Sequence, residues 1–192
     1  MIKSNKMKPS CFTAQHYALA KEHGIQADRI LFFEDLKELK KLALFHGVDQ
    51  STVDEYTVCT LGLCVRGDTS KGEEDETHIF IHRKLSDEAF EETYHRLKDQ
   101  NLNPCYDLMV TSEHGLLYAF ILLHELGHFR FKHECSTDVT ELAADQWACA
   151  ELWKFKDRFL NRGVPNRISS QKAREPNHSL SLNLSHEFPL GA

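Results

Sequence analysis

The sequence has no long apolar run and no pair of closely spaced cysteines. No segment approaches the roughly 18 apolar residues of a membrane span, and the charged N-terminus is not followed by a signal-type apolar stretch. The six cysteines include no CxxC pair, and without a secretory signal we expect reduced thiols. These absences predict a soluble, cytoplasmic protein that does not associate with a membrane.

An excess of basic residues is also lacking. The chain has 23 Lys and Arg against 29 Asp and Glu, a net charge of −6 and a pI near 6.0. This balance argues against a dedicated nucleic-acid surface. Hydrophobic residues make up 41% of the 192 residues, enough for one core. We expect a single domain over residues 1–160 and a polar, loose tail over residues 161–192, which prolines interrupt.

Hydrophobic periodicity predicts an α+β fold. We expect helices over residues 12–22, 34–45 and 85–102, the last of them exposed, and strands over 29–33, 56–65 and 77–82. A polar, acidic segment, 67–76, would join the last two strands as a wide hairpin or flap. If strand 77–82 lies at a sheet edge, it could bind a substrate peptide as an added strand; the alternative is an ordinary interior strand.

The segment His124-Glu125-Leu126-Gly127-His128 has the strongest functional signal. On a helix, His124 and His128 lie on one face and one turn apart, which suits two ligands of one zinc ion. Glu125 then lies beside the metal, placed to act on its bound water. The apolar run 116–123 before the motif predicts a buried helix, in which bound metal and hydrogen bonds offset the cost of burying polar side chains.

A catalytic zinc ion usually has three protein ligands, so a third must come from elsewhere in the fold. Ser136-Thr137-Asp138 is rich in N-capping residues and predicts a second helix running back antiparallel to the first. Glu141 and Asp145 would face the same way on it, and small residues, including Gly127, would let the helices approach closely. Asp145 would lie level with the histidines, but Glu141 has the longer reach, so both are candidates.

His124 to His128, followed by Glu141-x-x-Ala144-Asp145-x-x-Ala148, resembles the gluzincin-type zinc metallopeptidases, most closely the ImmA/IrrE-like family of small intracellular peptidases. The resemblance implies a small zincin-like domain whose active-site helix packs on a second, acidic helix beside a small β-sheet. It also implies that His124, His128 and Glu141 bind zinc and that Glu125 is the catalytic general base. Asp145 would hold one of the histidines.

The expected function is hydrolysis of peptide bonds in an intracellular protein, with one Zn²⁺ per chain. Zinc lowers the pKa of bound water to about 7 and polarises the scissile carbonyl, while Glu125 takes the water proton and returns it to the leaving amine. One alternative is a zinc-binding interaction module or regulator that does not cleave. Another is a hydrolase of non-peptide amides. The sequence identifies neither the substrate nor the donor to the oxyanion.

Overall fold

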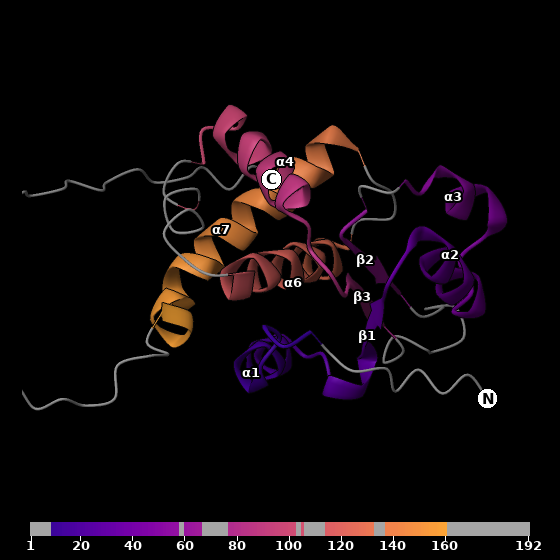
Figure 1. Cartoon of the computed structure of the whole chain (residues 1–192), viewed down its shortest axis with the longest axis horizontal. Coiled ribbons are helices and arrows are strands. Elements are labelled where there is room, and N and C mark those ends of the chain that lie inside the picture. Colours follow the sequence, from indigo (N-terminus) through magenta and orange to yellow (C-terminus); the bar gives the residue numbers. More distant parts are fainter. Residues whose placement is uncertain are drawn as a thin grey trace, which may run out of the picture. The chain divides into compact units, whose positions relative to one another are not determined.

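The fold is α+β, as predicted, with helices on both faces of a small sheet (Figure 1). The computed structural model describes residues 9–57, 60–66, 77–102, 105, 114–132 and 137–160. These residues belong to one compact unit, Met1–Arg162. The predicted flap 67–76 and the predicted tail 161–192 lie outside the described residues.

The described sheet has the strand order β1-β3-β2. β1 (Ile30–Phe33) pairs in parallel with β3 (His78–His82), and β2 (Gly62–Val65) pairs with β3 in antiparallel fashion. β3 is therefore central, and its residues Ile79, Phe80 and Ile81 are fully buried, as both faces of an interior strand require. Of the two alternatives for this strand, the structure shows the interior one; β1 and β2 form the edges of the described sheet.

N-capping residues set the start of the shorter helices. α1 (Ala14–Glu22) follows Thr13, and α2 (Leu36–Phe45) begins after Asp35, whose carboxylate accepts a hydrogen bond from the Glu38 amide. Each helix starts two residues after the predicted position because the capping residue itself is not helical. The predicted strand over 56–65 is too long: β2 begins only at Gly62, and the six-residue helix α3 (Gln50–Glu55) lies shortly before it.

α4 (Asp87–Asp99) occupies the centre of the predicted helix 85–102. Most of its side chains are exposed, as expected, but Thr93 and Leu97 are buried and fix one face of the helix against the rest of the fold. Glu92 and Arg96 are among its exposed residues, and both line a cleft.

α6 (His114–Phe131) forms the centre of the larger core cluster. Every residue from 116 to 123 is buried, which confirms the predicted buried helix. α1 and α7 (Asp138–Leu160) pack on α6, while a second cluster, with residues of α2 and the outer side of the sheet, includes Phe33, Leu39 and Phe80. Despite the apolar run in α6, no described helix has the length and apolar character needed to cross a membrane.

α6 and α7 form an antiparallel pair, as the capping residues predicted. Close contacts join His124 to Asp145 and His128 to Glu141, so the residue numbers rise on one helix as they fall on the other. A Cβ atom at Gly127 would lie 3.2 Å from the Cα atom of Ala144, tighter than most real contacts. The glycine therefore lets the two backbones approach closely enough for α7 carboxylates to reach the α6 histidines.

Candidate metal centre

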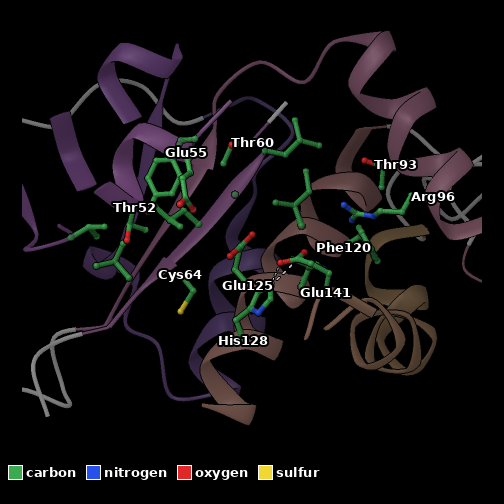
Figure 2. A pocket seen from close by; sticks show the side chains of 18 of the residues that line it. Thr52, Glu55, Thr60, Cys64, Thr93, Arg96, Phe120, Glu125, His128 and Glu141 are labelled. Atoms are coloured by element: carbon green, nitrogen blue, oxygen red, sulfur yellow. Dashed lines mark hydrogen bonds and ion pairs between the residues drawn. The ribbon is translucent and has the colours of Figure 1, made fainter. Parts of the chain in front are cut away.

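Three side chains of α6 and α7 direct their donor atoms toward one another (Figure 2). The Nε2 atoms of His124 and His128 are 3.1 Å apart. The Glu141 carboxylate reaches both rings, with Oε2 3.0 Å from Nε2 of His124 and Oε1 3.4 Å from Nε2 of His128. Among the described residues, no other group of three or more His, Cys, Asp and Glu side chains has donor atoms this close together.

These distances fit a zinc ion. Zn–N bonds of about 2.0–2.1 Å and tetrahedral angles place two nitrogen ligands roughly 3.3 Å apart, close to the three separations observed. Two imidazoles and one carboxylate are also the ligands of a known class of hydrolytic zinc sites. A cation between the rings would balance the carboxylate and take a lone pair from each Nε2 atom.

Asp145 contacts the opposite side of the His124 ring. Its Oδ1 atom lies 2.7 Å from Nδ1 of His124 and 3.0 Å from Nη2 of Arg96, and its side chain has no exposed surface. A carboxylate only accepts hydrogen bonds, so Nδ1 of His124 donates and Nε2 faces the other two donor groups. The implied contact between Asp145 and a histidine is confirmed, and it is Glu141 that reaches the Nε2 atoms.

Opposing effects act on the pKa of His124. Burial alone would lower the pKa of this imidazole, but hydrogen bonds to Asp145 and Glu141 and the charge of Glu125 raise it to about 9. In the metal-free protein, His124 therefore holds a second proton at neutral pH. That proton must leave before Nε2 can bind a metal ion.

We expect the metal-free protein to lose stability as the pH rises from about 6.5 to about 9. Folding raises the pKa of His124 above its ordinary value of 6.5. The bound proton therefore stabilises the folded state, fully so at pH values below about 6.5. The contribution disappears as the pH passes through the folded pKa. Urea unfolding in the presence of a chelator, at about pH 6 and about pH 9.5, measures the change.

Asp145→Asn is the control for this pH dependence, because the substitution keeps an oxygen acceptor near Nδ1 and removes the negative charge. The fall in stability between the two pH values should be smaller in this variant. A metal-free wild-type protein that is equally stable at both pH values would contradict the predicted proton on His124.

Glu125 is buried next to the triad formed by His124, His128 and Glu141, with 6% of its surface exposed. Burial raises the pKa of its carboxyl, while His124 and His128 act in the opposite direction. No described residue makes a hydrogen bond to this carboxylate, although it lines the cleft above the triad. A buried carboxylate with raised proton affinity, facing a cleft, has the properties of a general base.

A cleft of about 1280 Å³ opens over these side chains. Its lining includes residues 60–66, which contain the whole of β2, together with residues from α3 and α4. Glu55 and Thr52 lie on one side of the cleft and Thr93 and Arg96 on the other, with Glu125, His128 and Glu141 between them (Figure 2). The edge strand therefore runs along the same cleft that contains the triad.

Arg66 connects the edge strand to the motif helix. Its Nη2 atom donates hydrogen bonds to the carbonyl oxygens of His128 and Phe129, at 2.7 and 2.8 Å. These carbonyls belong to the last turns of α6, where backbone acceptors lack partners within the helix and a positive charge is favourable. Arg66 thus holds the end of β2 against the helix that provides both histidines.

Motifs in the sequence indicated His124, His128 and Glu125, with Glu141 and Asp145 both as candidates, but not the residues that surround them. Arg66, Arg96 and Gly62 contact the site residues or their backbone from distant parts of the chain. None belongs to a motif, so the sequence contains no signal for them.

Comparison with known proteins does not assign the chain to a family. No protein-family model matches the chain, and no curated protein or solved structure is significantly similar to it. The α+β fold and the side chains that line its cleft are therefore the features that bear on function.

Proposed function

We propose that the protein is a zinc-dependent peptidase of the ImmA/IrrE-like type that cleaves an intracellular protein. In this proposal His124, His128 and Glu141 bind one zinc ion and Glu125 is the general base. The observation that supports it most is the convergence of three ligand atoms at zinc-like distances next to a buried carboxylate. Neither feature alone would indicate hydrolysis, but both line one open cleft.

A bound zinc ion supplies a Lewis acid that polarises the scissile carbonyl and acidifies water. Glu125 accepts the proton of the attacking water and then donates it to the leaving amine. Burial favours this role, because it raises the pKa of the carboxyl and so its affinity for the proton. Asp145 fixes the orientation of the His124 ring, and Arg96 keeps the Asp145 carboxylate in place.

The shape of the cleft supports a peptide rather than a small amide as substrate. Its volume of about 1280 Å³ exceeds the roughly 300–1,000 Å³ of typical small-molecule pockets. β2 lines the cleft and is an edge strand of the described sheet. An edge strand offers backbone donors and acceptors to an extended peptide, so strand addition would involve β2 and not the central strand β3.

We expect the zinc-loaded protein to cleave members of a peptide pool made by digesting cell extract. Mass spectrometry would identify the new termini, a chelator should stop cleavage, and added zinc should restore it. Zinc content is measured on the same sample by plasma mass spectrometry. One zinc ion per chain is expected on the basis of the single candidate cluster in the described residues.

The alternatives predict different results in the same experiment. A zinc-binding module that does not cleave would contain one zinc ion per chain and produce no new termini from the pool or from intact extract proteins. A hydrolase of non-peptide amides would leave the peptides intact but release amine from amide compounds. A protein that binds no stoichiometric zinc, even after zinc is added, would overturn the metal centre itself.

A further inference from the structure

The side chain of Glu125 occupies the space that a side chain at position 62, on the edge strand β2, would need. A Cβ atom added at Gly62 would lie 2.5 Å from Oε1, 2.8 Å from Cγ and 2.9 Å from Cδ of Glu125. Real Cβ atoms essentially never approach another heavy atom within 3.0 Å. The overlap involves three atoms of one side chain, so a small shift of a single terminal atom would not relieve it.

Space, and not backbone conformation, is what this glycine provides. Gly24 and Gly47 adopt positive φ angles of +89° and +86° and have nothing within 4 Å of an added Cβ, so they are needed for their conformation. Gly62 has no such φ angle and lies in a regular strand. Alanine would normally be favoured over glycine there, since glycine weakens strands.

Packing against β2 also constrains the Glu125 carboxylate. Glu125 is buried, and no described residue holds its carboxylate by a hydrogen bond. Figure 2 shows it between Cys64 of β2 and Glu141 of α7. Little of the side chain is exposed, and β2 closes the space on one side. The strand backbone at Gly62 is therefore part of what sets the position of the carboxylate.

We propose that Gly62 is a positioning residue for Glu125, because the absence of a side chain at this point of the edge strand creates the space that holds the carboxylate beside the metal ligands. The three atoms nearest an added Cβ all belong to Glu125, and none belongs to His124, His128 or Glu141. We therefore expect a substitution at Gly62 to act first on Glu125. The catalytic consequence rests on the proposed function, whereas the packing relation does not.

A thermal-unfolding cycle tests the packing relation without any substrate. It compares wild type, Gly62→Ala, Glu125→Ala and the double variant, each metal-free and zinc-loaded. Gly62→Ala should lower the Tm of the wild type, because the new Cβ overlaps Glu125. In the Glu125→Ala background the overlapping atoms are gone, so Gly62→Ala should leave the Tm unchanged or raise it. An equal fall in both backgrounds would overturn the proposal.

Gly115→Ala is the matched control. An added Cβ at Gly115 has its nearest neighbour, the carbonyl oxygen of Cys11, at 3.8 Å, an ordinary van der Waals contact. This change should have the same effect on Tm with and without Glu125, and it should leave zinc content and turnover as in the wild type.

Kinetics then test the catalytic consequence, with a peptide identified from the cleaved pool. Gly62→Ala should lower kcat by about tenfold or more, with zinc content near one per chain and KM within about twofold of the wild type. A Gly62→Ala variant with kcat within about twofold of the wild type would show that Gly62 does not position the base.

Failure of the proposal and failure of the proposed function give different results. Coupling between Gly62 and Glu125 in the Tm cycle, with no cleavage of any peptide by the wild type, would reject the peptidase and retain the packing relation. Cleavage by the wild type, with a Gly62→Ala variant that has normal kcat or with no coupling between Gly62 and Glu125 in the Tm cycle, would retain the peptidase and reject the role of Gly62.

Discussion

Replacing Glu125 with glutamine will stop peptide hydrolysis and leave about one zinc ion bound per chain. Glutamine has nearly the same shape as glutamate, so it fits the space over Gly62, but its amide does not accept the proton of the attacking water. Loss of general base catalysis lowers rates by about 10²–10⁴-fold. Peptide cleavage by mass spectrometry and zinc content by plasma mass spectrometry, on the same sample, measure the two effects.

Glu91→Gln is the matched control for this experiment. Glu91 is an exposed glutamate of α4 and does not line the cleft. The control should retain both zinc and turnover within about twofold. A Glu125→Gln protein that retains more than about a tenth of wild-type turnover would show that Glu125 is not the base. Loss of zinc from the same variant would instead assign it a structural part in the metal centre.

Replacing His124 with alanine will remove the metal and also destabilise the fold. The variant lacks a ligand nitrogen, so zinc should fall from about one per chain to a small fraction of that after dialysis against metal-free buffer. It also leaves the fully buried Asp145 with only one of its two described partners, Arg96. A lost hydrogen bond to a buried acceptor costs about 1–3 kcal/mol, which urea unfolding of the metal-free protein measures.

Substitutions of the two α7 carboxylates, Glu141 and Asp145, should affect zinc binding differently. Glu141→Ala should lose zinc with little loss of metal-free stability, since the Glu141 side chain is partly exposed. Asp145→Asn should still bind zinc, but about 10–100-fold more weakly, because Asp145 acts through His124. Competition with a chelating dye measures these affinities.

His95→Ala, which removes an exposed histidine of α4, should bind zinc as the wild type does. The proposed ligand set would be wrong if Glu141→Ala kept stoichiometric zinc while Asp145→Asn lost it. Retention of stoichiometric zinc by His124→Ala would equally exclude the assignment of His124 as a ligand.

Local patterns in the sequence predicted much of the site. Two histidines four residues apart share one helix face, and the apolar run before them indicates burial. The capping residues near Asp138 predicted the start of α7 and its antiparallel course. These features are readable because helical geometry fixes the relation between residues separated by only a few positions.

Which α7 carboxylate reaches the Nε2 atoms could not be predicted in this way. An ideal hairpin placed Asp145 level with the histidines and Glu141 one turn nearer the bend. In the structure Asp145 meets Nδ1 of His124 and Glu141 meets both Nε2 atoms, so the two carboxylates lie on different sides of one ring. The outcome depends on the separation and rotation of two packed helices, which close contact at Gly127 helps to set.

The sequence by itself determined the two histidines, the buried helix that presents them and the adjacent carboxylate of Glu125. Only the tertiary structure decided that β2, and not β3, forms the edge beside the cleft, and that Gly62, Arg66 and Arg96 surround the site. Arg66 and Arg96 act on residues 62 and 49 positions away in the chain. Contacts between residues so far apart in the chain depend on how whole helices and strands pack, so local sequence periodicity does not predict them.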